Sequence, residues 1–184
     1  PSGMAVQSGT VGTVEVAEID QGKVYIFPKL DGTNASAWLK DDEIQAGSRN
    51  RHLDESSDGD NAGFCKWVRK QENITKFLKA HPHLRLFGEW LVPHSLRTYR
   101  DDAWQKFYVF DVVNLETNQF VHYENYQPLL EEYRVDYVPC LWQSTTVTID
   151  LLLDLLKKNT YLIKDGEGFG EGLVVKNYEF VNKF

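Results

Sequence analysis

Four short segments carry side chains that could act together on a phosphate group. The first, KLDGTN, begins at Lys29, which follows a short apolar run and precedes a turn signal at Asp31-Gly32. A lysine held at a strand end can face a pocket and attack phosphorus once its amine has lost a proton. Burial and nearby cations favour that loss for lysines in general. A solvated lysine in a surface hairpin is an equally good interpretation of these six residues alone.

The other three segments place charged groups beside apolar strands. Ser48-Arg49-Asn50-Arg51 is a cationic patch that, taken alone, is better explained as a solvated loop. Phe87-Gly88-Glu89-Trp90 and the run ending at Asp111 each put a carboxylate in or just after an apolar strand, where burial demands a partner such as a sugar hydroxyl, a hydrated metal or an arginine. The run from Glu171 to Lys176 puts a carboxylate and a lysine around a short apolar strand.

The elements that position these groups follow from hydrophobic periodicity. Strands dominate, and the helices do not alternate with them regularly, so the fold class is α+β. Residues 24–27 and 34–39 are expected to form a hairpin with Lys29 to Gly32 at its bend. The predicted strands are 24–27, 34–39, 43–48, 84–92, 107–113, 120–123 and 173–175, and the predicted helices are a single one over 64–78, then 128–133 and 149–158.

Composition limits the classes of function. The net charge of −7 argues against a protein that coats nucleic acid nonspecifically, but it allows an enzyme with a local basic groove. Cys65 and Cys140 lack zinc-site spacing and suggest reduced thiols. No apolar run reaches the roughly 18 residues of a membrane span. We therefore expect a cytoplasmic protein with no membrane association and no obligatory protein partner. His81, His83 and His94 have no paired spacing on one element, so we expect structural or solvent-exposed roles for them.

The order KLDGTN, SRN, FGEW, FYVFD, EGLVVK resembles motifs I, Ia, III, IIIa and IV of the covalent nucleotidyltransferases, over roughly residues 24–176. This superfamily contains DNA ligases, RNA ligases and mRNA capping enzymes. Asn34 is typical of phage-type RNA ligases, whereas the other two classes usually have arginine there. The resemblance implies a nucleotidyltransferase (ATP-grasp-like) domain of antiparallel sheets flanked by helices, which uses ATP and Mg²⁺ or Mn²⁺ to join 5′-phosphate and 3′-hydroxyl RNA ends. A DNA ligase, a capping-type enzyme and a non-catalytic nucleotide or RNA-end binding module remain alternatives.

The resemblance also implies a role for each motif residue. Lys29 would form the lysyl–AMP bond, and Asn34 and Arg49 would lie near the reacting phosphates or the RNA end. Adenine would stack between Phe110 and Val174. Glu89 would contact the ribose or metal-bound waters, and Lys176 would contact phosphate. Asp31 and Glu171 would help to hold a hydrated Mg²⁺ or Mn²⁺.

The same resemblance sets expectations for domain organisation. We expect residues 1–12 to be a disordered tail and residues 13–184 to form the nucleotidyltransferase domain. A further motif V, with one or two lysines on a strand, should follow motif IV, and Lys183 does not resemble it. We therefore expect this chain to stop before motif V, to have no C-terminal domain, and to adenylylate slowly.

Overall fold

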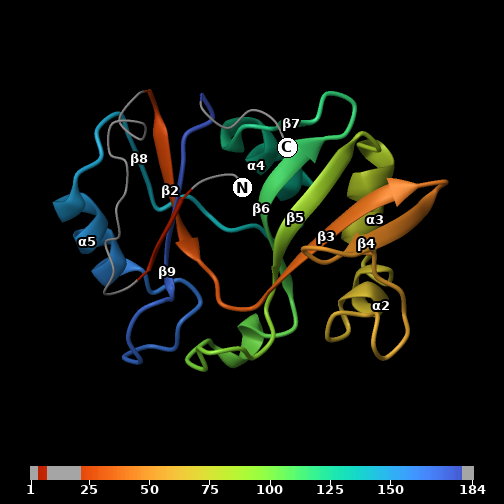
Figure 1. The fold of residues 1–184 in the computed structure, drawn as a ribbon, viewed down its shortest axis with the longest axis horizontal. Coiled ribbons are helices and arrows are strands. Elements are labelled where there is room, and N and C mark those ends of the chain that lie inside the picture. Colours follow the sequence, from red (N-terminus) through yellow and green to blue (C-terminus); the bar gives the residue numbers. More distant parts are fainter. Residues whose placement is uncertain (1–3, 8–21, 180–184) are drawn as a thin grey trace. The chain divides into compact units, whose positions relative to one another are not determined.

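The computed structural model describes residues 4–7 and 22–179, and the chain divides into two compact units (Figure 1). Unit 1 combines residues 1–31, 93–104 and 138–184, and unit 2 combines residues 32–92 and 105–137. The single domain expected over residues 13–184 is thus organised as two units, and the chain passes from the first to the second between Asp31 and Gly32.

Unit 1 contains a four-stranded antiparallel sheet with the order β1-β9-β2-β8. The helix α5 begins where the Thr148 side chain accepts a hydrogen bond from the Leu151 amide, and its apolar stripe packs on one face of the sheet. The elements are β1 (Met4–Gln7), β2 (Val24–Lys29), β8 (Trp142–Ser144), β9 (Gly172–Lys176), α5 (Ile149–Lys158) and a 3₁₀ turn, η1 (Asp101–Ala103).

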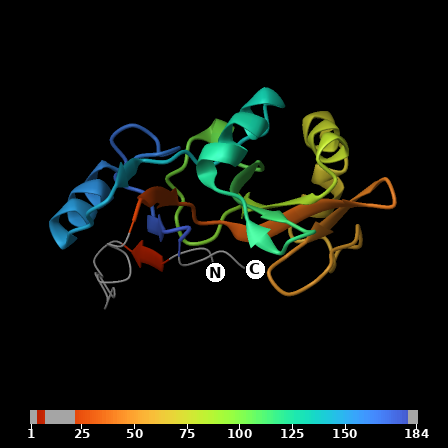
Figure 2. The ribbon, with the colours of Figure 1, turned by 90° about the horizontal axis from the view of Figure 1, so that it is seen from above.

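Unit 2 contains a five-stranded antiparallel sheet with the order β4-β3-β5-β6-β7. Figure 2 shows α3 and α4 on the same side of this sheet, and the main apolar core of the unit lies between the helices and that face. The elements are β3 (Thr33–Lys40), β4 (Glu43–Gly47), β5 (Leu84–Trp90), β6 (Phe107–Asn114), β7 (Gln119–Phe120), α2 (Phe64–Val68), α3 (Glu72–Ala80) and α4 (Tyr123–Glu132).

The α+β class with antiparallel sheets and flanking helices is confirmed, but the predicted hairpin is wrong. β2 is hydrogen-bonded to β8 and β9, whereas β3 is hydrogen-bonded to β4 and β5, so the two strands belong to different sheets. Period-two patterns identify strands but not their partners, because pairing depends on contacts that are distant in sequence. Lys29 to Gly32 therefore link two sheets.

Other elements differ from expectation more locally. The single helix predicted over residues 64–78 is two helices, because the amides of Lys70 and Gln71 turn back to carbonyls three residues earlier and end α2. α4 begins at Tyr123, which the sequence placed in a strand, and β8 was not predicted. Residues 4–7 form β1, unlike the disordered tail expected there, and the rest of that tail lies outside the described residues. No helix within the described ranges is long and apolar enough to cross a membrane.

Candidate active site

Lys29 lies at the end of β2, on the sheet face opposite α5. Val24 and Ile26 belong to the apolar cluster that α5 covers, so the alternation of a strand directs Tyr25, Phe27 and Lys29 to the other face. The register with β9 adds Gly172, Val174 and Lys176 to this face, directly opposite Lys29, Phe27 and Tyr25 respectively. Val174 and Lys176 therefore lie on the same sheet face as Lys29.

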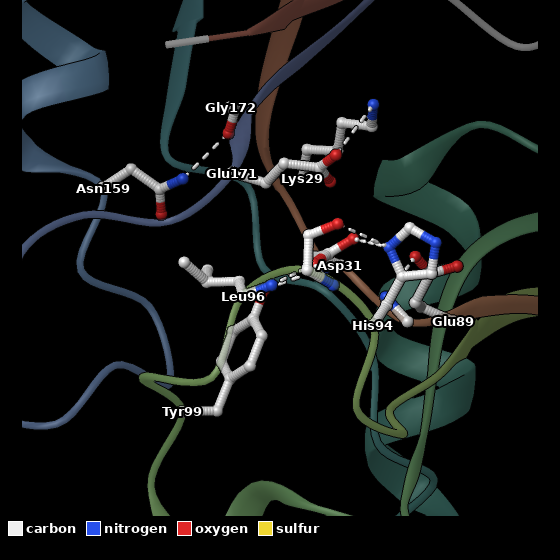
Figure 3. Close-up of polar contacts among 11 residues, drawn as sticks. Lys29, Asp31, Glu89, His94, Leu96, Tyr99, Asn159, Glu171 and Gly172 are labelled. Atoms are coloured by element: carbon white, nitrogen blue, oxygen red, sulfur yellow. Dashed lines mark hydrogen bonds and ion pairs between the residues drawn. The ribbon is translucent and has the colours of Figure 1, made fainter.

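The Lys29 amine faces the Glu171 carboxylate (Figure 3). Lys29 Nζ lies 3.6 Å from Glu171 Oε1, and the two side chains are 27% and 28% exposed. Burial raises the pKa of Glu171 above its ordinary value, and the positive charge of Lys29 opposes part of that rise. The pair joins motif I to motif IV, a contact that the sequence did not predict.

Asp31 has a different environment from the one the sequence suggested. Its carboxylate is 5% exposed and accepts hydrogen bonds from His94 Nδ1 at 2.9 Å, from the Ser95 amide at 2.8 Å and from the Leu96 amide at 2.5 Å. The Asp31 amide in turn donates to the Tyr99 hydroxyl at 2.9 Å. Asp31 thus fastens the segment after β2 to residues 94–99, and both carboxylate oxygens, expected to serve a metal, are occupied by protein donors.

Two further residues of unit 1 that contact these motifs were not identified from the sequence. His94, expected to have a structural or solvent-exposed role, is 65% exposed and is oriented by Asp31. Asn159, which ends α5, is 1% exposed and donates to the Gly172 carbonyl at 2.8 Å (Figure 3). Neither residue has a motif-like spacing, because their partners lie far away in the chain.

Lys176 and Val174 differ in exposure although they share a face. Val174 is half-buried, whereas Lys176 is 1% exposed and its Nζ lies 4.4 Å from the centre of the Phe27 ring. A cation over an aromatic face is an attractive arrangement, and it is stronger when water is excluded. The phosphate contact expected of Lys176 stays a prediction.

Unit 2 assembles a second set of motif residues around Asn34 and Glu89, which are directly opposite each other on β3 and β5. With its amide oriented to satisfy both ends, Asn34 donates to Glu89 Oε1 at 3.1 Å and accepts from Arg49 Nε and Nη2 at 2.9 and 2.7 Å. Glu89 Oε2 accepts from the Gly32 amide at 3.1 Å. Motifs I, Ia and III thus meet in one hydrogen-bond network, and Glu89 has the partners that a carboxylate on an apolar strand requires.

Glycines in motifs I and III are required by close backbone contacts. A Cβ on Gly32 would lie 2.3 Å from the Trp90 carbonyl oxygen, and one on Gly88 would lie 2.4 Å from the Tyr108 carbonyl oxygen. Both distances are far below van der Waals contact, so a side chain at either position would push the strands apart. These glycines keep the network around Glu89 compact.

Phe110 is the extra residue of a β-bulge in β6. Phe87 pairs with Asp111 and Gly88 pairs with Val109, so the register shifts by one residue at Phe110. The Phe110 ring is half-buried, and its carbonyl accepts from the Tyr126 hydroxyl at 3.2 Å. A bulge beside a ligand site can redirect a side chain, which is consistent with the stacking role expected of Phe110.

The expected metal carboxylates do not gather into a cluster within either unit. Across the part of the chain that the structure describes, no group of three or more His, Cys, Asp or Glu side chains could hold a metal ion. Of the expected ligands, Asp31 accepts three hydrogen bonds from protein donors, whereas Glu171 is half-buried beside Lys29. Oxygen donors of this kind suit Mg²⁺ and Mn²⁺.

Comparison with solved structures identifies the fold. A Naegleria gruberi RNA ligase with PPi is 20% identical with a TM-score of 0.69, over 98% of this chain and 57% of that chain. A variant of that ligase with ATP and Mn is 20% identical with a TM-score of 0.70, over 98% of this chain and 57% of the variant. Another variant, with AMP and Mn, is 20% identical with a TM-score of 0.69, over 92% of this chain and 51% of the variant. This chain therefore spans a little over half the length of the Naegleria ligase.

Sequence comparison identifies the family. No curated protein gives a significant match to the chain. The RNA ligase family profile, in contrast, matches residues 22–183, which include all five motifs. Together with the matching fold, this match shows that the chain belongs to the RNA ligase family.

Proposed function

We propose that this chain is the catalytic domain of an ATP-dependent RNA ligase and that Lys29 is its nucleophile. The observation that carries the proposal is the position of Lys29: a lysine at the end of a buried strand, 3.6 Å from a half-buried carboxylate, in a chain of the RNA ligase family. The Naegleria ligase of the same fold has been solved with ATP, with AMP and with PPi, which are the substrate and products expected of nucleotidyl transfer.

In the first step the unprotonated Lys29 amine attacks the α-phosphorus of ATP. A nitrogen–phosphorus bond forms, the bond to the leaving pyrophosphate breaks, and the amine proton passes to water. The lysyl–AMP then transfers AMP to an RNA 5′-phosphate, and a 3′-hydroxyl attacks that phosphate and releases AMP. Because phosphoryl transfer depends on positioning and on charge stabilisation, the protein needs rigid donors more than new chemical groups.

The described residues fit these needs in the following way. Lys29, Glu171, Val174 and Lys176 belong to unit 1, whereas Asn34, Arg49, Glu89 and Phe110 belong to unit 2. We propose that Phe110 and Val174 contact adenine, that Glu89 contacts the ribose, and that Arg49 and Lys176 contact phosphate. The Arg49–Asn34–Glu89 network orients the guanidinium before any nucleotide binds.

The metal assignment is narrower than the sequence suggested. We propose that Glu171, and Glu89 through water, serve Mg²⁺ or Mn²⁺, because Asp31 already binds three protein donors. A bound divalent cation would offset charge on the α-phosphate and on the leaving pyrophosphate. Asp31 instead holds the segment that follows Lys29, which is a positioning role.

The experiment that tests this proposal is labelling by nucleotide. The protein is incubated with ATP labelled at the α-phosphate and with Mg²⁺ or Mn²⁺, then separated on a denaturing gel. We expect covalent labelling by ATP and not by GTP, and sealing of RNA with a 5′-phosphate and a 3′-hydroxyl in preference to nicked DNA. Nucleotide binding without a covalent product would instead support a non-catalytic end-binding module.

The cysteines of the chain bear on its location. The two cysteines of the chain, Cys65 and Cys140, are not joined in a disulfide. Free thiols persist in reducing compartments, which also supply ATP and Mg²⁺, so we propose a cytoplasmic location. RNA ends are the proposed partners.

A further inference from the structure

Asn159 is a buried polar residue at the point where α5 ends. Its side chain is 1% exposed, and its amide Nδ2 donates to the Gly172 carbonyl at 2.8 Å. Its backbone carbonyl accepts from the Gly170 amide at 2.8 Å. The amide Oδ1 also receives the Tyr161 amide at the longer distance of 3.4 Å. One residue therefore binds the chain on both sides of Glu171, and Figure 3 shows its bond to Gly172.

The contact between Asn159 and the residues around Glu171 is close. A Cβ added to Gly170 would lie 2.7 Å from Asn159 Nδ2, so only glycine fits there without displacing the amide. Gly172 lies directly opposite Lys29 in the β2–β9 register. The segment 170–172 thus runs between two fixed partners, the Asn159 amide and the Lys29 strand.

Asn159 follows a helix that is packed firmly on the far face of the sheet, so its position is well defined. Leu152, Leu155 and Leu156 pack there against strand residues of β2 and β9, and each is at most 7% exposed. Asn159 follows this anchored helix directly. The position of Glu171 is therefore tied to the packing of α5 through two hydrogen bonds rather than left to a free loop.

We propose that Asn159 is a positioning residue that holds Glu171 at the Lys29 amine for nucleotidyl transfer. The inference rests on the proposed function, because it assigns Asn159 to the same reaction. Because Asn159 is 1% exposed, it acts on the reaction through Glu171. A buried amide is suited to positioning, because its Nδ2 donor has one well-defined acceptor. Loss of the Nδ2 donor leaves the Gly172 carbonyl buried without that partner, which is costly.

The expected effect is on the rate rather than on ATP binding. Misplacement of a reacting group by about 1 Å costs on the order of a hundredfold in rate. We therefore expect Asn159→Asp, which replaces the Nδ2 donor with a carboxylate oxygen of the same shape, to slow single-turnover adenylylation roughly ten- to a hundredfold. The KM for ATP should change by less than about threefold, since uniform binding is untouched.

Two matched variants separate positioning from general destabilisation. Thr148→Ala removes the side-chain bond at the other end of α5, so it weakens the same helix without touching Glu171. It should leave the rate per folded molecule near wild type. Gly170→Ala reaches Glu171 from the opposite side by displacing the Asn159 amide, and it should reproduce the rate loss even if Asn159→Asp folds poorly.

A double-mutant cycle and a structure decide the inference. In a Glu171→Gln background, Asn159→Asp should reduce the adenylylation rate little further, because the carboxylate that Asn159 positions is already absent. Full multiplicative losses in the double variant, or a Thr148→Ala loss as large as that of Asn159→Asp, would overturn the inference. A crystal structure of Asn159→Asp tests positioning without nucleotide. We expect the 3.6 Å separation of Lys29 and Glu171 to lengthen, and an unchanged separation would refute the role whether or not the wild type labels with ATP.

Discussion

The Lys29 amine lies 3.6 Å from the Glu171 carboxylate, although most of the chain separates the two residues in sequence. The contact is made by the β2–β9 pairing, which sets Lys29 directly opposite Gly172. Both side chains are about one-quarter exposed, so each remains accessible to a ligand. This pair joins motif I to motif IV and is the focus of the predictions on catalysis.

Lys29→Ala should abolish covalent labelling by ATP and leave the fold intact, because Lys29 is the proposed nucleophile and its side chain is partly exposed. The measurement is gel labelling together with a thermal melt. Lys40→Ala, at the exposed end of β3, is the control and should label normally. Undiminished labelling of Lys29→Ala would rule out Lys29 as the nucleophile.

Glu171→Gln should strongly reduce adenylylation while leaving the apo protein as stable as wild type, or more stable, at pH 7.5. The pKa of Glu171 is raised in the folded state, chiefly by burial, so the folded protein holds this proton more tightly than the unfolded chain does. Its contribution to stability is therefore present below the unfolded pKa of about 4.5 and is lost as the pH rises through the raised folded pKa.

Gln cannot ionise, so it removes the burial cost of the charge at neutral pH. Melting temperatures in EDTA across pH 4 to 8 check this prediction. The difference between the variant and the wild type should be largest near pH 8 and should shrink toward pH 4. A variant that is much less stable at pH 8 but fully active would mean that Glu171 serves only as the ion-pair partner of Lys29.

Asp31→Ala should lower the free energy of unfolding by about 2–4 kcal/mol, because the amides of Ser95 and Leu96 lose a buried charged acceptor. Urea denaturation measures the loss. His94→Ala is the matched control, since it removes one partner of the same carboxylate. His94 is 65% exposed, so its removal should cost less than about 1 kcal/mol. If Asp31→Ala were as stable as wild type and had an altered Mn²⁺ requirement, Asp31 would be a metal ligand rather than a positioning residue.

Phe110→Ala should weaken ATP binding by roughly one to two orders of magnitude, because stacking of a base on an aromatic ring is worth on the order of 1–3 kcal/mol. Isothermal titration with ATP gives the affinity. Phe169→Ala is the control, since its ring is 50% exposed and belongs to no motif. If Phe110→Ala bound ATP normally, we would assign the stacking role to Tyr108, which pairs with Glu89 across the β5–β6 register.

The local features of the site could be predicted from the sequence. The strands predicted over residues 24–27 and 173–175 lie within β2 and β9, and the period of two that any strand has places Lys29 on the face opposite Val24 and Ile26. The need of Glu89 for a buried partner also follows from the sequence, because a carboxylate within an apolar strand cannot remain unsatisfied. These properties depend only on neighbouring residues, so the sequence determines them.

The partners of these residues depended on the tertiary structure. Asp31 resembles a metal ligand in sequence, yet the loop at residues 94–96 occupies its carboxylate. Asn159 looks like an ordinary helix end, yet it holds both neighbours of Glu171. Lys29 to Gly32 resembles a hairpin bend, yet it connects two sheets. In each case the decisive contact joins segments far apart in the chain, and strand register and helix packing select it, whereas periodicity reports only which face a side chain occupies.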